Sequence, residues 1–240
     1  MHSLSITIPA YNEAGSIKKV VDKARTIAQE VIVVDDGSTD GTGDIVKRIP
    51  GVTLITHKTN QGFSGAIRSC YRNATKDIIF LLPADGQIDP ADCALFLKKI
   101  EHADVVVGYR KNNPESLSRQ LNSKIFHLIY RALFGVKLKE ISTSILWRKT
   151  VLDSIEITAN PRSALIEPEV IFKAWSAGFR FAEVGIPYYP RKTGQPKGSN
   201  PFMILVTIKE LIRLYISSRL LIHTPALNPD RNHEDRILPH

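Results

Sequence analysis

Three short segments of the chain combine carboxylates with small, turn-forming residues, and each follows a run of apolar residues. They read Pro9-Ala10-Tyr11-Asn12-Glu13, Asp35-Asp36-Gly37-Ser38 and Pro83-Ala84-Asp85-Gly86-Gln87. If the apolar runs are parallel strands, the three segments meet at the carboxyl edge of one sheet. There, carboxylates can accept hydrogen bonds from the ribose and base of a nucleotide, and a divalent cation can bridge Asp85 to its diphosphate. The spacing therefore predicts a nucleotide site that works with a metal ion.

The apolar runs that lead into these segments have the features of buried strands. Ile78–Leu82 is apolar without alternation, as expected for a central strand covered by helices on both faces, and Pro83 ends it because proline has no N–H. Similar runs predict strands at Leu4–Pro9, Val31–Val34, Val52–Thr56 and Asp104–Gly108. Segments of helical periodicity separate them, which predicts an α/β fold with a doubly wound, mostly parallel sheet.

The chain beyond residue 110 is organised differently. We expect a loop at Arg162–Pro168, a strand at Arg180–Ile186 and helices at Leu117–Phe134, Glu169–Ala177 and Phe202–Ile222. The segment 191–201 is rich in Gly, Pro and Lys and is expected to be mobile, and the polar tail 223–240 is expected to be disordered. The predicted organisation is one domain over residues 1–200, with halves at 1–110 and 111–200, followed by helix 201–222 and the tail.

The net charge of +8 lies entirely in the second half of the chain. Residues 1–108 hold 12 Lys and Arg against 13 Asp and Glu, whereas residues 109–240 hold 20 against 11. Such an excess favours an anionic partner, which is a membrane surface, a phosphorylated ligand or nucleic acid. The chain has no stripe of basic and aromatic residues and no base-reading motif, so nucleic acid is the least favoured of the three.

The cysteines and the apolar segments bear on the compartment. Cys70 and Cys93 are the only cysteines, which suggests a reducing compartment and no metal cluster. The N-terminus lacks a basic segment followed by an apolar one, so no signal peptide is predicted. No stretch reaches the roughly 18 to 20 apolar residues that span a bilayer. We therefore expect a cytoplasmic protein that is at most peripheral to the inner face of the membrane.

Two helices of the second half are predicted to be amphipathic. In the helix at 117–134, an apolar stripe lies opposite a basic stripe formed by Gln120, Lys124, His127 and Arg131. In the helix at 202–222, one face carries Ile204, Leu205, Ile208, Leu211, Ile212 and Tyr215, and the other carries Lys209, Arg213 and Ser217. The second pattern is typical of a helix that lies in the plane of an anionic membrane surface. The alternative is a helix packed on the core or on another subunit of a homo-oligomer.

Taken together, the motifs resemble those of family 2 glycosyltransferases, which have the GT-A fold. The resemblance covers roughly residues 4–200 and rests on Ser5–Glu13, Val31–Gly41, Asn60-Gln61-Gly62 and Ala84–Gln87. Within that family, Val106–Arg110, Arg119 with Arg131, and Arg191–Gly194 are similar to the branch that transfers sugars to polyprenyl phosphates such as dolichyl or undecaprenyl phosphate. The resemblance implies inverting transfer from a nucleotide-diphosphate sugar.

The same resemblance assigns roles to residues of this chain. Asp36 would contact the nucleobase or ribose, and Asp85 with Gln87 would hold Mg²⁺ or Mn²⁺ and the diphosphate. The complete set expected to bind the nucleotide sugar is Pro9, Ala10, Tyr11, Glu13, Asp36, Gly37, Asn60, Ala84 and Asp85.

The basic second half fits a phosphate acceptor. A phosphate monoester is mostly dianionic at pH 7, so it needs no general base but does need cations that position it. The guanidinium fork of arginine matches phosphate geometry. The candidates for the acceptor phosphate are Arg119, Arg131, Arg191 and Lys197, and we interpret Asp85, Arg119 and Arg131 as the catalytic groups.

Two other interpretations remain open. A glycosyltransferase that acts on a sugar hydroxyl needs a general base, for which Glu167 and Glu169 are the candidates. Pro83 stands where the family's metal motif begins with an Asp, and Glu140 stands where an Asp is usual. The loss of one of two carboxylates lowers the expected metal affinity. It also leaves open a protein that binds nucleotide sugars without turning them over.

Overall fold

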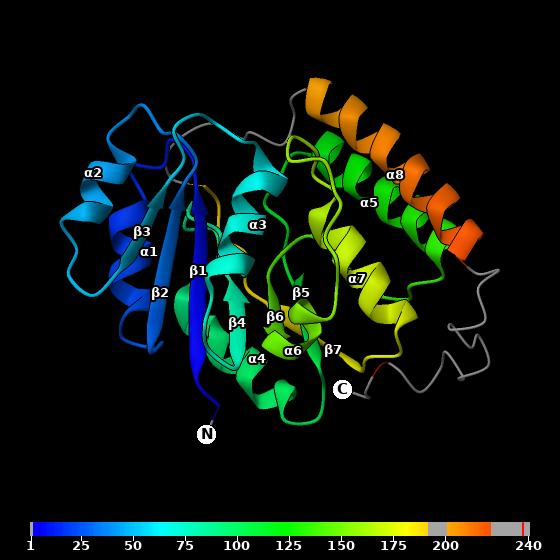
Figure 1. Ribbon diagram of the computed structural model, residues 1–240, viewed down its shortest axis with the longest axis horizontal. Coiled ribbons are helices and arrows are strands. Elements are labelled where there is room, and N and C mark those ends of the chain that lie inside the picture. Colours follow the sequence, from blue (N-terminus) through cyan, green and yellow to red (C-terminus); the bar gives the residue numbers. More distant parts are fainter. Residues whose placement is uncertain (1, 192–200, 222–236, 238–240) are drawn as a thin grey trace.

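The computed structural model describes residues 2–191, 201–221 and 237, and this part of the chain contains one seven-stranded sheet (Figure 1). The strand order is β3-β2-β1-β4-β6-β5-β7. The strands are β1 (Leu4–Ala10), β2 (Glu30–Asp35), β3 (Thr53–Thr56), β4 (Ile78–Leu81), β5 (Val105–Arg110), β6 (Ile145–Arg148) and β7 (Phe181–Ile186). Each pairs in parallel with its neighbour, except that β6 is antiparallel to both β4 and β5. The predicted α/β fold with a mostly parallel sheet is confirmed.

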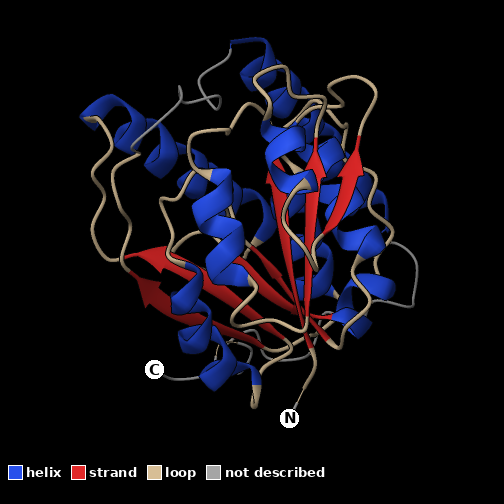
Figure 2. Ribbon diagram, turned by 90° about the vertical axis from the view of Figure 1, so that its left-hand side faces the viewer, coloured by secondary structure: helices blue, strands red, loops and turns tan. Residues whose placement is uncertain are grey.

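Helices cover both faces of this sheet (Figure 2). They are α1 (Ile17–Ala24), α2 (Thr42–Lys47), α3 (Phe63–Asn73), α4 (Cys93–Ile100) after the 3₁₀ turn η1 (Pro90–Asp92), α5 (Leu117–Phe134), α6 (Lys149–Asp153), α7 (Ile166–Ser176) and α8 (Pro201–Leu221). Alternate strand residues point to opposite faces and so feed two separate cores. Val31 and Val33 join the core under α1 and α4, whereas Ile32 and Val34 join the core under α3 and α7.

The start of α7 and the presence of α6 and β6 differ from the sequence prediction. Helix α7 begins at Ile166, so the loop expected to extend to Pro168 was wrong. Proline is tolerated there because the N–H groups of a first helical turn have no partner within the helix. The sequence did not predict β6, which separates β4 from β5, or the short helix α6 that follows it. Strand β6 has only four residues, and its partners come from distant parts of the chain.

Helix α5 has the predicted bounds but not the predicted orientation of its basic stripe. His127 belongs to that stripe, yet it is buried together with Tyr130 and Phe134. Its Nδ1 lies 2.6 Å from the carbonyl oxygen of Ser123, and its Nε2 accepts the N–H of Ile141 at 3.2 Å. The helix therefore packs on the core through an aromatic face, and its row of aliphatic residues points outward.

The predicted tail and mobile segment fall mostly outside the described residues. Segment 192–200, which contains Lys197, and segment 222–236 are not described. Ile237 is described and forms a parallel bridge with Phe181 of β7.

Candidate functional site: the carboxyl edge of the sheet

The loops that follow β1 and β2 are joined by hydrogen bonds. The N–H of Asp36 donates to the carbonyl of Ala10, the last residue of β1, at 2.8 Å. The N–H of Glu13 donates to the hydroxyl of Thr42 at 2.8 Å, and Thr39 N–H donates to the side chain of Asn12 at 2.8 Å. These hydrogen bonds hold together the loops that contain Pro9, Ala10, Tyr11, Glu13 and Asp36 at the carboxyl edge, where Ala10, Glu13 and Asp36 are buried.

Asp36 is buried, and its carboxylate accepts three hydrogen bonds from within the protein. Its exposed fraction is 2%. One oxygen lies 2.6 Å from Nδ1 of His57 and accepts the N–H of Gln61 at 2.8 Å, and the other accepts the N–H of Gly62 at 3.0 Å. In the free protein, Asp36 therefore fixes the turn that precedes α3. Any hydrogen bond to a nucleobase or ribose would be added to these three.

His57 is a site residue that sequence reasoning missed. Its second nitrogen lies 2.9 Å from the hydroxyl oxygen of Ser69 on α3, so the imidazole connects Asp36 to that helix. The parallel register pairs Asp35 with Thr56, and the next residues along the two strands are Asp36 and His57. Asp36 and His57 could therefore have been recognised as neighbours only if the pairing of β2 with β3 had been known.

Gly37 lies where its loop closely approaches the backbone at Asn60. Gly37 has a φ of +72°, and a Cβ built on it would lie 2.9 Å from the backbone nitrogen of Asn60. Any larger residue would push the loops apart. The exposed Asn60 lines a surface hollow with Thr59, Gln61, Asn160, Pro161 and Arg162.

Asp85 and Glu13 are joined by one arginine. Nη1 of Arg191 lies 2.9 Å from Oε1 of Glu13, and Nη2 lies 2.9 Å from Oδ2 of Asp85. The side chains of Arg191, Asp85 and Glu13 are 17%, 14% and 7% exposed. Burial raises the pKa of Asp85, an effect that the hydrogen bond from Gln87 N–H and the charge of Arg191 oppose. The predicted acceptor-phosphate residue and the predicted metal ligand are thus in direct contact.

The donor groups at Asp85 fit a cation held by one or two protein carboxylates together with substrate phosphates. The described part of the chain has no cluster of three or more His, Cys, Asp or Glu side chains able to ligate a metal. The Gln87 amide lies 3.2 Å from the carbonyl of Tyr189 and 3.4 Å from Glu115. The guanidinium of Arg191 already places a positive charge between Asp85 and Glu13. In proteins, Mg²⁺ can bind through one or two carboxylates, with substrate phosphates and water as its other ligands. Asp85 is the residue that would hold such a cation.

The predicted cationic residues lie at different distances from Asp85. Arg119 forms an ion pair with Glu115, whose carboxylate also contacts Gln87, so the start of α5 reaches the loop after β4. Arg131 lies twelve residues further along α5, about 18 Å at 1.5 Å per residue, and donates to the carbonyl of Lys139 at 2.9 Å. The structure therefore brings Arg191 directly to Asp85 and Arg119 near it. It does not bring Arg131 there, and Lys197 lies outside the described residues.

The two candidate bases of the hydroxyl-acceptor alternative have different surroundings. Glu169 accepts hydrogen bonds from Thr158 and Ala159 and an ion pair from Lys173 at 2.6 Å, so it holds the loop before α7. Glu167 is buried, with an exposed fraction of 2%. Burial raises its pKa to about 8.

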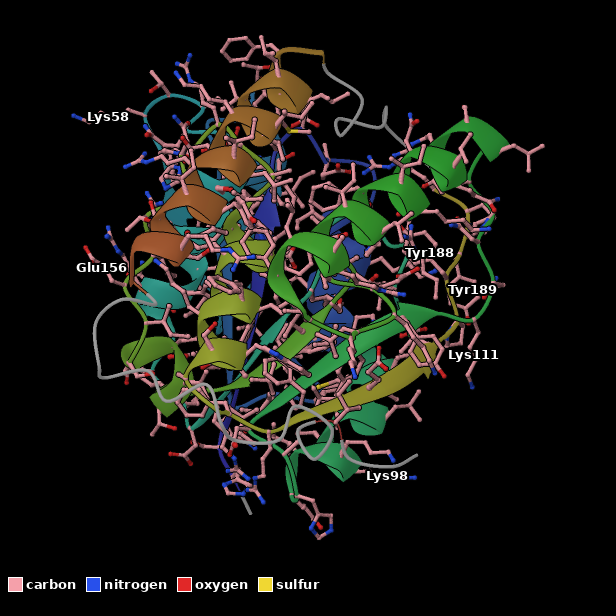
Figure 3. The ribbon with its side chains drawn as sticks, turned by 90° about the vertical axis from the view of Figure 1, so that its right-hand side faces the viewer. Lys58, Lys98, Lys111, Glu156, Tyr188 and Tyr189 are labelled. Carbon is pink, nitrogen blue, oxygen red and sulfur yellow. The ribbon has the colours of Figure 1, made fainter. Side chains whose placement is uncertain are left out.

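Two tyrosines, Tyr188 and Tyr189, and two basic residues, Arg110 and Lys111, also lie at this edge of the molecule. Figure 3 shows Tyr188, Tyr189 and Lys111 together near the ends of β5 and β7. The guanidinium of Arg110 lies over the ring of Tyr188, 5.2 Å from its centre, and forms an ion pair with Glu140 at 3.0 Å. Burial, with the nearby charge of Asp85, raises the pKa of Tyr188 to about 12. The tyrosine therefore remains a neutral hydroxyl beside Asp85.

The parallel sheet, the edge of carboxylate loops and the helices on both faces define an α/β protein of the GT-A type. The sequence model of glycosyl transferase family 2 matches residues 5–155. The chain belongs to that family, and the prediction of a family 2 glycosyltransferase is confirmed.

Relatives of the chain are named for transfer to undecaprenyl phosphate. An undecaprenyl-phosphate mannosyltransferase from Micrococcus luteus is 29% identical over 210 residues, which cover 80% of this chain and 86% of that protein. An undecaprenyl-phosphate 4-deoxy-4-formamido-L-arabinose transferase from Pseudomonas syringae is 28% identical over 223 residues. The match covers 87% of this chain, which spans 64% of the length of that relative.

Solved structures support the fold. Glucosyl-3-phosphoglycerate synthase from Mycobacterium tuberculosis, in complex with Mn²⁺, UDP and phosphoglyceric acid, superposes with a TM-score of 0.73 at 17% identity. The superposition covers 89% of this chain and 78% of that one. The same enzyme with Mg²⁺ and UDP gives a TM-score of 0.70 at 18% identity, over 90% and 79% of the two chains. At this identity the likeness establishes the GT-A-like fold.

Proposed function

We propose that the protein transfers a sugar from a nucleotide-diphosphate sugar to a polyprenyl phosphate at the surface of an anionic membrane. The acceptor's phosphate oxygen attacks the anomeric carbon, the bond to the diphosphate breaks, and a nucleoside diphosphate leaves. A dianionic monoester becomes a monoanionic diester, so no proton has to be removed. A divalent cation at Asp85 would neutralise the leaving diphosphate. The names of the curated relatives support this acceptor class, and the Mn²⁺ and Mg²⁺ in the synthase structures support a divalent cation.

The observation that carries this proposal is an apolar surface on two helices beside the site. Eleven of the thirteen exposed large hydrophobic side chains among the described residues lie on α5 and α8. They are Leu117, Leu121, Ile125, Leu128, Ile129, Phe202, Ile204, Leu205, Ile208, Ile212 and Ile216. Figures 1 and 3 show both helices on the same side of the molecule, and they meet where Phe134 contacts Tyr215.

This helix pair, α5 with α8, supports attachment in the plane of a membrane. No helix among residues 2–191 and 201–221 is long and apolar enough to cross a bilayer. Helix α8 is held to the rest of the protein by Leu211, which is buried in the core, and by Tyr215, which packs against it, so these two residues do not lie on the outward apolar face that the sequence predicted. Two polar contacts add to this packing, since Thr207 accepts the N–H of Ala164 at 2.9 Å and Glu210 accepts that of Asn160 at 3.3 Å. The exposed apolar side chains of α8, from Phe202 to Ile216, lie outside this contact and face outward. A lipid held there would present its phosphate toward the start of α5, where Glu115 links Arg119 to the donor loop.

Transfer assays test the proposal. Labelled UDP-, GDP- and dTDP-sugars are offered with Mg²⁺ or Mn²⁺ to a short polyprenyl phosphate and, as the matched control, to the same polyprenol without phosphate. We expect transfer to the phosphate alone. Transfer to a saccharide hydroxyl instead would support the alternative acceptor, and nucleotide-sugar binding without any turnover would support a non-catalytic protein.

The variant Asp85→Asn tests the donor half of the same proposal. It removes the charge that would hold the cation, so we expect transfer to fall more than tenfold, over about 1.4 kcal/mol. Its thermal unfolding should stay cooperative with a lower midpoint, because the ion pair with Arg191 is lost. Wild-type turnover by this variant in saturating Mg²⁺ or Mn²⁺ would remove Asp85 from the mechanism.

A further inference from the structure

Arg191 joins three distant parts of the chain at the donor site. Glu13 follows β1, Asp85 follows β4, and Arg191 follows β7. Its two terminal nitrogens each lie 2.9 Å from one carboxylate oxygen, and all three side chains are largely buried. Water screens buried charges poorly, so the guanidinium strongly compensates Asp85 and Glu13 in the free protein.

We propose that Arg191 occupies the place of the divalent cation in the free protein and leaves Asp85 when that cation binds. A Mg²⁺ ligand oxygen lies about 2.0 to 2.1 Å from the ion, and Oδ2 of Asp85 now accepts from Arg191 at 2.9 Å. A dication on that oxygen would repel a guanidinium at hydrogen-bond distance. Cation and guanidinium therefore compete for Asp85.

The structure also keeps the displaced arginine close. The N–H of Tyr189 donates to the carbonyl of Gln87 at 2.9 Å, and the Gln87 side chain lies 3.2 Å from the carbonyl of Tyr189. These contacts anchor the backbone two residues before Arg191 to the loop that holds Asp85. The exchange then requires only the arginine side chain to move.

Exchange couples the two substrates, a step that rests on the proposed function. Arginine donates through five N–H groups in a planar fork that matches phosphate. While the fork spans Asp85 and Glu13, both terminal nitrogens are engaged. After the arginine leaves Asp85, Nη2 is released for the acceptor phosphate. The cation that arrives with the donor thereby prepares the acceptor site, and polyprenyl phosphate binds more tightly after the donor.

A Mn²⁺ titration without any substrate tests the exchange itself. Free Mn²⁺ is followed by its electron paramagnetic resonance signal for the wild type, Arg191→Ala, Arg191→Lys and Asp85→Asn. We expect Arg191→Ala to bind Mn²⁺ at least tenfold more tightly than the wild type, because the competing cation is gone. Asp85→Asn should lose this binding.

Two further variants separate exchange from a general change of charge. Arg180→Ala removes one positive charge at the opposite end of β7, where Arg180 pairs with Asp104 at 3.4 Å, and should leave Mn²⁺ affinity within twofold. Arg191→Lys keeps the charge but not the fork, so its affinity should lie between those of the wild type and Arg191→Ala. If Arg191→Lys bound Mn²⁺ with the affinity of the wild type, the positive charge alone would account for the effect by repelling Mn²⁺. That result would overturn the exchange.

Other results would also overturn it. Mn²⁺ affinity in Arg191→Ala that is unchanged, weaker than in the wild type, or undetectable at millimolar Mn²⁺ would show that Arg191 does not compete for the site. Because no nucleotide or lipid is present, these results are independent of the acceptor. A polyprenyl phosphate that never binds, together with tighter Mn²⁺ binding in Arg191→Ala, would refute the proposed acceptor and keep the exchange.

Discussion

The polar side chains at the carboxyl edge of the sheet are paired within the protein, whereas many apolar side chains of the helix pair are exposed to solvent. At the edge, Asp36 accepts three hydrogen bonds within the protein, and Arg191 joins Glu13 to Asp85. On the helix pair, Leu117 is 83% exposed and Leu205 is 67% exposed. A polar site that is already hydrogen-bonded is organised before its ligand arrives, whereas large exposed apolar patches mark a partner surface. Substitutions should therefore affect stability and donor binding at the edge, and association with lipid on the helices.

The largest effect is expected at the edge, from Asp36→Ala. The change leaves His57 and the N–H groups of Gln61 and Gly62 without their acceptor, each at a cost of about 1 to 3 kcal/mol where the group stays buried. We expect the affinity for a nucleoside diphosphate to fall tenfold to a hundredfold, measured by titration calorimetry.

Variants of His57 are the matched controls for that prediction. In His57→Asn an amide N–H can replace Nδ1 as the donor to Asp36, so affinity should stay closer to that of the wild type than in His57→Ala. Equal losses in the two variants would mean that the hydrogen bond to Asp36 is not what His57 contributes.

A smaller effect is expected on the helix pair, where substitutions should weaken binding to lipid and leave stability nearly unchanged. Leu205→Ser with Ile208→Ser removes two exposed apolar side chains, each worth about 1.5 to 3 kcal/mol when fully buried. Binding to liposomes that contain anionic lipid should fall at least tenfold in a co-sedimentation assay. The free energy of unfolding should change by less than about 0.5 kcal/mol, as for most surface substitutions.

Lys98→Ser is the control for charge in that assay. Figure 3 places Lys98 on a different part of the molecule from α8, so its loss should weaken liposome binding only slightly. A loss equal to that of the double variant would mean that total charge holds the protein. Wild-type binding by the double variant would exclude α8, and a change of molar mass in light scattering would point to a homo-oligomer instead.

Much of the fold could be predicted because its signals are local. Ile78–Leu81 and Val105–Val107 are apolar runs that stay strands in any context where both faces are covered. The β6 strand could not be predicted, because four residues carry little signal and its antiparallel pairing depends on β4 and β5. The orientation of α5 was also out of reach. Its aliphatic and aromatic faces are both apolar, and only the packing of Tyr130 and Phe134 decides which is buried.

Site residues that belong to a local sequence motif could be predicted. Contacts between residues that are distant in the sequence could not, because the fold alone brings those residues together. Asp36 and Asp85 could be chosen because each follows a strand at the carboxyl edge. The ion pair between Arg191 and Asp85 spans 106 residues and depends on β7 lying beside β5. His57 gives no signal until the register of β2 with β3 is known. Such contacts are fixed by sheet order, which no local pattern encodes.

The smallest effect on transfer is expected from Glu167→Gln, which tests whether the acceptor needs a base. A phosphate acceptor has no proton to lose, so transfer should stay within twofold of the wild type. A sugar hydroxyl would need the base, and transfer would then fall by about a hundredfold or more.

The pH dependence of the free energy of unfolding provides an internal check on the protonation of Glu167. The folded-state pKa of Glu167 is raised to about 8, above its ordinary value of 4.5. The stabilisation from its bound proton is therefore complete below pH 4.5 and is lost as the pH rises toward 8. Thermal unfolding at pH 5 and pH 8 should show the wild type losing a few kcal/mol, roughly 1.4 kcal/mol per pKa unit, relative to Glu167→Gln. Parallel pH profiles would mean that the carboxyl is ionised in the folded protein.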